Sequence, residues 1–266
     1  MSSLLSRVAV AAAGLPIVLF AAYYGGWSLF VVAALGALLA LHELYQMGRS
    51  LRPLVLAGYG GALAAVLGAS LGGAEWMLGG FALTLLLGFA FAAVSETRQS
   101  TTVAIATTML GAAWIGLGLG HLVLLRDLEP DGRLLLVTVL VTVFIADTFA
   151  FLGGRLAGRH RMAPGISPGK TWEGFVAGAA LGILATWFAL YEQDVLEDTW
   201  RPFVVGGIIV LAAVAGDLFE SMVKRDLGVK DSGRVLLGHG GVLDRVDSLV
   251  FAAPAAYYAF LALAQG

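Results

Sequence analysis

Two polar segments in the second half of the chain, residues 147–174 and 216–247, concentrate the residue types that perform chemistry. Asp217, Ser221 and Lys224 follow one another at intervals of four and three, so a helix would carry them on one face. Asp244 and Asp247 are three residues apart at the start of a later apolar stretch, and a helix would bring them onto one face too. Carboxylates buried near a bilayer are costly and usually face a polar cavity with a partner. These three aspartates therefore form a candidate site.

The chemistry of that site follows from its donor atoms. Carboxylate oxygens without cysteine or clustered histidine favour a hard cation such as Mg²⁺, commonly shared with substrate phosphates. Nearby lysines and arginines can clamp phosphate oxygens, and Gly238, Gly240 and Gly241 leave backbone N–H groups able to approach an anion. His239 lies between two of these glycines, in a charged loop. The pattern indicates phosphoryl or nucleotidyl transfer, although acid–base pairs at a helix end also form salt bridges that only fix a bundle.

The first polar segment contains Gly169-Lys170-Thr171, which looks like the end of a phosphate-binding P-loop. That motif needs glycine five residues before Gly169, where this chain has Pro164, so we reject a P-loop. Lys170 remains a candidate phosphate ligand, and Thr171 is positioned to cap the helix that follows. Asp147 lies late in an otherwise apolar stretch, which predicts a polar cavity or an ion pair with a loop cation.

The elements that position these residues are predicted to be membrane helices. The 266 residues are 59% hydrophobic and only 13% charged, whereas a soluble domain carries about 25% charged residues. Abundant glycine favours close helix packing, and the absence of cysteine excludes disulfides and thiolate chemistry. About nine apolar segments are long enough to cross a bilayer, which predicts an all-α polytopic bundle. They lie near residues 7–24, 27–47, 53–73, 76–95, 102–125, 134–154, 173–191, 203–222 and 248–264.

Positive charge orients this bundle. With the N-terminus in the cytoplasm and nine alternating spans, thirteen of the sixteen Lys and Arg residues fall on the inside. Only Arg126, Arg133 and Arg201 fall outside, so the C-terminus is expected outside and both polar segments in the cytoplasm. The first apolar segment resembles a signal peptide but has no clear cleavage site, so we expect it to stay in the protein. We divide the chain into a helical scaffold, residues 1–130, and a catalytic part, residues 131–266.

Residues 221–247, here called the signature segment, carry a spaced motif. It reads Ser221-x-Val223-Lys224-Arg225-x4-Lys230-Asp231-x-Gly233-x2-Leu236-x2-His239-Gly240-Gly241-x2-Asp244-Arg245-x-Asp247. This motif resembles the signature of the phosphatidate cytidylyltransferases, also called CDP-diacylglycerol synthases, and residues 147–174 resemble that family's second shared region. Further likeness lies in Gly14-Leu15-Pro16 and in Glu43 near the end of the second apolar segment. Two positions depart from the pattern: Leu237 stands in place of proline, and Gly169 in place of a frequent lysine.

The resemblance implies the reaction of CTP with phosphatidate to give CDP-diacylglycerol and pyrophosphate in the cell membrane. It further implies a bundle that often dimerises, so we expect a homodimer among membrane lipids, with no nucleic-acid partner. It implies metal at Asp217, Asp244 and Asp247, with Mg²⁺ and K⁺ as candidate cations. The expected catalytic residues are Ser221, Lys224, Arg225, Lys230 and His239. The expected substrate-binding residues are Asp147, Lys170, Asp231, Gly240, Gly241 and Arg245.

The sequence is also compatible with two other functions. A related membrane transferase would use CTP with another lipid phosphate or an isoprenoid alcohol, because the acceptor depends on a groove that the sequence does not reveal. An ion-coupled transporter would also carry intramembrane acids such as Asp147 and Asp217, but it usually has broken helices in two related halves. Here the polar residues are concentrated in the second half of the chain and on one side of the membrane.

Overall fold

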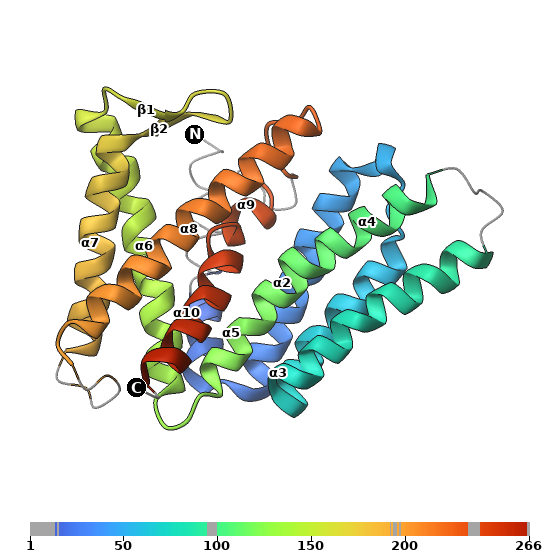
Figure 1. Ribbon diagram of the computed structural model, residues 1–266, viewed down its shortest axis with the longest axis horizontal. Coiled ribbons are helices and arrows are strands. Elements are labelled where there is room, and N and C mark those ends of the chain that lie inside the picture. The colour runs from blue at the N-terminus through green and yellow to red at the C-terminus, as the bar shows by residue number, and fades with distance from the viewer. Residues whose placement is uncertain are drawn as a thin grey trace. The chain divides into compact units, whose positions relative to one another are not determined.

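In a computed structural model, the described part of the chain consists mainly of helices, joined by turns and loops and accompanied by one short β-hairpin (Figure 1). The structure describes residue 14 and residues 16–94, 100–191, 193, 196, 198–233 and 240–264. Long apolar helices dominate these residues, as expected of segments that satisfy their own backbone hydrogen bonds within lipid. The predicted all-α, multi-pass membrane architecture is therefore confirmed.

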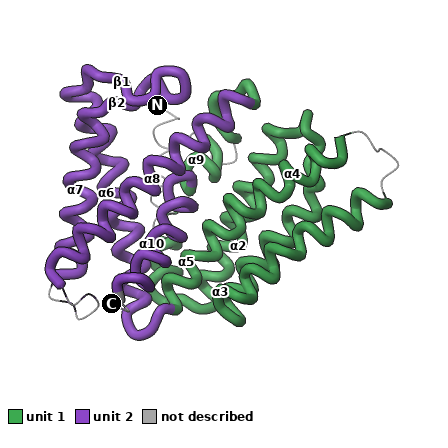
Figure 2. Tube along the Cα trace, in the orientation of Figure 1, with its two compact units in different colours: residues 1–127, 227–246 green, residues 128–226, 247–266 purple. Residues whose placement is uncertain are grey.

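The chain forms two compact units (Figure 2). Unit 1 combines residues 1–127 with residues 227–246, and unit 2 combines residues 128–226 with residues 247–266. The signature segment is thus shared: its first part belongs to unit 2, its middle to unit 1, and Asp247 to unit 2 again. The functional division that we predicted at residue 130 stays a prediction.

Unit 1 contains the N-terminal helices. After helical residues 16–24, its elements are α2 (Gly26–Met47), η1 (Arg49–Leu51), α3 (Val55–Val94), α4 (Thr101–Gly111), the π-helical η2 (Ala112–Leu117), α5 (Gly118–Arg126) and α9 (Leu243–Val246). The 40-residue α3 breaks at Gly72 and Gly73, and Gly73 has a φ of +71°. A Cβ on Gly61 would collide with Thr84, and one on Gly80 would collide with Ala64. These contacts show that the two limbs of α3 fold back on each other.

Unit 2 carries the first polar segment. Its elements are α6 (Gly132–Ala157), β1 (Arg161–Ala163), β2 (Ser167–Thr171), α7 (Trp172–Leu190), α8 (Arg201–Asp226) and α10 (Leu249–Ala264). Glycines allow α7 to approach α6 closely: a Cβ on Gly174 would lie 2.5 Å from the Ala150 carbonyl oxygen, and one on Gly178 equally close to that of Ala146. The hairpin lies at one end of these helices and the end of α10 at the other (Figure 1).

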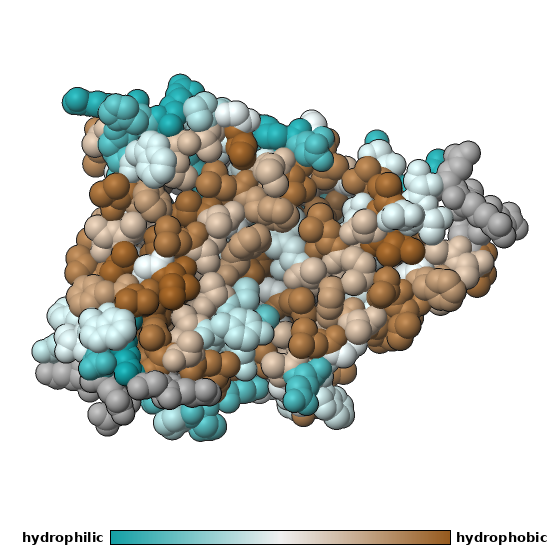
Figure 3. All heavy atoms as spheres, in the orientation of Figure 1, coloured by the Kyte–Doolittle hydropathy of each residue, from teal (hydrophilic) through white to brown (hydrophobic). Residues whose placement is uncertain are grey.

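Seven helices of the described residues are long and apolar enough to cross a membrane. One of them is α3, whose two limbs on either side of Gly72–Gly73 coincide with the separate segments expected near 53–73 and 76–95. The segment expected near 7–24 lies largely outside the described residues. The expected number of nine spans stays a prediction. On the face of unit 2 shown in Figure 3, apolar side chains cover the middle of the helices and hydrophilic ones gather toward the ends, as expected of a membrane-spanning bundle.

Candidate active site

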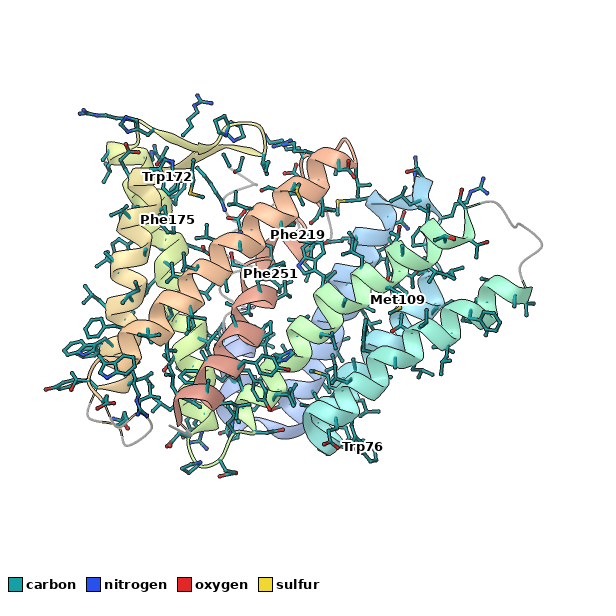
Figure 4. All side chains as sticks on the ribbon, viewed as in Figure 1. Trp76, Met109, Trp172, Phe175, Phe219 and Phe251 are labelled. Carbon is teal, nitrogen blue, oxygen red and sulfur yellow. The ribbon has the colours of Figure 1, made fainter. Side chains whose placement is uncertain are left out.

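Helix α8 carries Asp217, Ser221 and Lys224, which confirms that one helix holds these three residues. It also approaches the start of α10 unusually closely. A Cβ on Gly216 would collide with the Asp247 carbonyl oxygen and would lie 3.0 Å from the Phe251 Cβ. Phe219 and Phe251 pack beside this contact, with ring centroids 5.4 Å apart (Figure 4). The missing side chain at position 216 thus allows Asp217 and Asp247 to share one region of unit 2.

The β1–β2 hairpin brings Lys170 to the same region. Lys170 Nζ lies 2.6 Å from Asp217 Oδ2, and the two side chains are 23% and 32% exposed, so water only partly screens the pair. At the hairpin turn, Arg225 Nε donates a hydrogen bond of 3.2 Å to the Ile166 carbonyl oxygen. Two contacts therefore tie α8 to the hairpin. We expected Lys170 to bind phosphate, and the structure places it beside a carboxylate expected to bind metal.

Glu173 and Thr171 fix the other side of the hairpin. The Glu173 carboxylate accepts hydrogen bonds from the backbone N–H groups of Arg159 and His160, and its Oε1 lies 2.6 Å from His160 Nδ1. Thr171 Oγ1 accepts a bond of 3.1 Å from the Gly174 N–H and caps α7 as predicted. Lys170 is therefore carried by a strand that is anchored at both ends.

More carboxylates surround the Lys170–Asp217 pair. Asp147 on α6 accepts a hydrogen bond from the buried Ser248 and interacts electrostatically with both Asp217 and Lys170. Asp247 interacts electrostatically with Asp147 and Asp217 and lies near Glu220. Glu220, only 1% exposed, in turn pairs with Lys224 at 2.7 Å. We call these six residues the acid–lysine cluster: Asp147, Lys170, Asp217, Glu220, Lys224 and Asp247.

Unit 1 holds other residues that the sequence predicted to be functional. We call the described residues 230–233 and 240–246 the signature turn; it exposes Lys230, Asp231 and Arg245. Asp244 Oδ2 accepts a hydrogen bond of 2.8 Å from the Gly241 N–H, and both carboxylate oxygens accept from the Ser232 N–H. Gly240, with a φ of +80°, adopts a conformation that other residues rarely tolerate. The glycines of the motif thus serve a tight turn closed by Asp244.

Comparison with known proteins decides the family. The family model described as "Cytidylyltransferase family" matches residues 5–263. The chain belongs to the cytidylyltransferase family.

Three curated relatives match 62% to 90% of this chain. It is 34% identical to a phosphatidate cytidylyltransferase of Staphylococcus haemolyticus over 90% of this chain and 91% of the relative. It is also 34% identical to one of Staphylococcus epidermidis, over 86% and 88% of the two chains. A Staphylococcus aureus phosphatidate cytidylyltransferase is 37% identical over 62% of each chain.

The acid–lysine cluster has the chemistry of a hard-cation site. Four carboxyl groups lie near two lysines, and every metal-ligating atom that the acids offer is an oxygen. Within the described ranges, however, no three histidine, aspartate or glutamate side chains already surround one point. Asp217 is engaged by Lys170, and the Asp244 carboxylate by two backbone N–H groups. A cation that binds Asp217 would have to replace its contact with Lys170.

The structure brings some of the predicted site residues together and leaves others apart. Asp147, Lys170, Asp217, Lys224 and Asp247 lie in one cluster of unit 2, whereas Gly240, Gly241 and Asp244 lie in unit 1. The expectation that Asp244 and Asp247 share a helix face is wrong, because α9 ends at Val246 and Asp247 lies in the turn that follows. Ser221 lies on α8, and His239 lies outside the described residues.

Three residues that contact the predicted site residues were not predicted from the sequence. No role was predicted for Glu220, which is buried and accepts a hydrogen bond from Lys224. Ser248 follows the motif directly and donates to Asp147. Glu43 had been noted for the family resemblance alone, although it contacts the signature turn. The sequence signal that could have identified Glu43 is the presence of an acidic residue inside an apolar segment.

Proposed function

We propose that the chain is a phosphatidate cytidylyltransferase, which converts CTP and phosphatidate to CDP-diacylglycerol and pyrophosphate. Membership of the cytidylyltransferase family and the names of the relatives support the reaction class and both substrates. The structural observation that carries the proposal is the pairing of Lys170 with Asp217 inside a cluster of carboxylates. That arrangement suits a reaction between two polyanions, because it supplies both a cation for phosphate and oxygens for a metal.

The reaction exchanges one phosphoanhydride bond for another. An oxygen of the phosphatidate phosphate attacks the α-phosphorus of CTP and forms a new P–O bond. The bond from that phosphorus to the oxygen bridging to the β-phosphate breaks, and its electron pair leaves with pyrophosphate. The attacking phosphate is already an anion at neutral pH, so it needs little help from a general base. The main obstacles are the repulsion between the two substrates and the charge that develops on the leaving group.

The residues of the chain meet these obstacles by charge and position. Lys170 would neutralise a phosphate of CTP, held in place by the anchored hairpin. Lys224, Arg225 and Lys230 would bind further phosphate oxygens. Ser221 and His239 would orient the substrates. The Gly240 N–H would approach an anion, and Gly241, whose N–H is held by Asp244, would allow the backbone to come close to it. Asp147, Asp231 and Arg245 would complete the substrate site.

A divalent cation completes the proposal. Mg²⁺, when bound, would neutralise phosphate charge and stabilise the departing pyrophosphate. Asp217 and Asp247, with Asp147 beside them, would hold it in unit 2, and Asp244 is the ligand proposed from unit 1. K⁺ remains the second proposed cation.

The membrane arrangement agrees with these substrates. We propose nine spans in the cell membrane, with a cytoplasmic N-terminus, an outside C-terminus and the site facing the cytoplasm, where CTP is available. The distribution of Lys and Arg supports this orientation. The proposed assembly is a homodimer.

Pyrophosphate release by the purified protein tests the function directly. Protein in detergent micelles containing phosphatidate and Mg²⁺ should release pyrophosphate only when CTP is added, and should form CDP-diacylglycerol in equal amount. ATP in place of CTP should give much less product. Dolichol or another isoprenoid alcohol, offered in place of phosphatidate, tests the alternative acceptor. If the alcohol is used and phosphatidate is not, the proposed lipid substrate is wrong.

A further inference from the structure

Glu43 is a buried acid that the reaction above does not use. It lies on α2 in unit 1, is 2% exposed, and stands among apolar residues of a candidate membrane span. A carboxylate in such a place is costly unless it is well hydrogen-bonded. Its partners therefore indicate what it does.

Among the residues that the structure describes, the hydrogen-bond partners of Glu43 all belong to the signature turn. Its Oε1 accepts a hydrogen bond of 3.0 Å from the Val242 N–H, and its Oε2 accepts one of 2.9 Å from the Leu243 N–H. Oε2 also accepts from the buried Ser232 hydroxyl at 3.2 Å. Hydrogen bonds to a carboxylate are stronger than those between neutral groups. These three join residues about two hundred positions apart in the chain.

Two motif glycines make room for this carboxylate. A Cβ on Gly233 would lie 2.6 Å from Glu43 Oε1, and a Cβ on Gly241 would collide with Glu43 Oε2 and with the Ser232 hydroxyl. At these two positions the turn passes so close to Glu43 that it has no space for a side chain. The glycines of the motif are thus explained by Glu43 as much as by an approaching phosphate.

Glu43 and Asp244 hold the turn together from different sides. Ser232 gives its hydroxyl to Glu43 and its backbone N–H to Asp244, while Gly241 gives its N–H to Asp244. The two carboxylates therefore share Ser232, and the position of Asp244 depends on where Glu43 holds the turn.

We infer that Glu43 is a positioning residue for the reaction: it sets the conformation of the signature turn, and with it the placement of Asp244 and the flanking Lys230 and Arg245. This inference rests on the proposed function for its kinetic consequences, whereas its structural half does not depend on the substrate. Glu43 acts through the turn and contacts no reacting group.

Glu43→Gln is the test, because the amide keeps the size of the side chain but replaces one acceptor oxygen with a donor that faces a backbone N–H. A turn misplaced by about 1 Å lowers turnover on the order of 10²-fold, so we expect kcat to fall by that factor while KM for CTP changes by less than about threefold. Glu43→Asp keeps the charge with a shorter reach and should recover part of the rate. Glu75→Gln makes the same substitution at an exposed glutamate of unit 1 and should leave kcat unchanged.

Limited digestion with trypsin supplies a readout that needs no activity. Lys230 and Arg245 are exposed and flank the residues that Glu43 holds, whereas Arg161 is an exposed site in unit 2. In Glu43→Gln, cleavage after Lys230 and Arg245 should be about tenfold faster, because a released turn opens more often, and cleavage after Arg161 should be unchanged. Should turnover fall while cleavage at Lys230 and Arg245 stays at the wild-type rate, the inference is wrong. Wild-type turnover in folded Glu43→Gln would contradict it equally.

Ser232→Ala decides the matter if Glu43→Gln does not accumulate as folded protein. It removes one donor to Glu43 and retains the backbone bond to Asp244. We expect a threefold to tenfold lower kcat, roughly the effect of one hydrogen bond, together with faster cleavage after Lys230. Wild-type values for both would overturn the inference. If even the wild-type protein releases no pyrophosphate, the proposed function fails, and the digestion pattern still tests the role of Glu43.

Discussion

Lys170 Nζ lies 2.6 Å from Asp217 Oδ2, so the residue proposed to bind phosphate neutralises the residue proposed to bind metal. The pair is partly shielded from water, so its Coulombic attraction is screened less than that of a surface ion pair, while desolvation of the two charges offsets part of this gain. When a phosphate binds together with its cation, Lys170 can exchange Asp217 for phosphate oxygens, and Asp217 can exchange Lys170 for the cation. The pair thus keeps both charges compensated until the substrate supplies new partners.

Substitution of Lys170 tests the phosphate half of this exchange. Lys170→Met should lower kcat/KM for CTP about 10²-fold, or about 2.7 kcal/mol, because one preorganised charged donor to the leaving pyrophosphate is lost. Lys170→Arg should recover part of the loss, since charge is kept but geometry differs. The apparent KM for phosphatidate should move much less. Arg161→Met, an exposed cation on the same hairpin, is the control and should be silent. A rise in the phosphatidate KM with normal CTP kinetics would assign the hairpin to the lipid site instead.

Substitution of the acids tests the metal half. Asp217→Asn, Asp244→Asn and Asp247→Asn should each abolish turnover in protein that remains folded in detergent, and excess Mg²⁺ should not restore the full rate. The reason is that an amide is a much weaker ligand for a hard cation than a carboxylate. Asp226→Asn, at the exposed end of α8, provides the matched control and should keep normal turnover. Near-normal turnover in any of the first three variants removes that residue from the site.

Sequence reasoning succeeded where the signal is local. Apolar length predicted the membrane helices, the spacing of Asp217, Ser221 and Lys224 predicted their common helix, and Thr171 was correctly expected to cap α7. Each of these features depends on residues within a few positions of one another, so it can be read from a short window.

It failed where the partner is distant or the element is short. Glu43 bonds Leu243, 200 positions away, and no local pattern contains that pairing. The strands of the hairpin are three and five residues long, too short to show an alternating pattern. Asp244 and Asp247 have helical spacing, but α9 stops between them. These are tertiary features, decided by what packs against the segment.

Reporter fusions test the orientation of the bundle. In unit 2 the hairpin and the end of α10 lie at opposite ends of the helices, so the two positions should lie on opposite sides of the membrane (Figure 1). A reporter fused after Gly266 should report the outside, and one inserted in the loop from Arg159 to Lys170 should report the cytoplasm. Two reporters on the same side would contradict the structure of unit 2. Opposite sides in the reverse sense would contradict only the orientation inferred from positive charge.

Gly216 offers a test of the close approach between α8 and the turn that carries Asp247. In Gly216→Ala the new methyl group would collide with the Asp247 carbonyl oxygen, so the turn must move away from Asp217. Overpacking of this kind costs about 1–3 kcal/mol of stability, and the shifted carboxylate should lower kcat about tenfold or more. Gly207→Ala on the same helix meets open space and should keep full activity, with stability unchanged or raised by the better helix former. Turnover in detergent and the thermal unfolding midpoint measure the two effects. If Gly216→Ala matches Gly207→Ala in both, Asp217 and Asp247 need not be held together for catalysis.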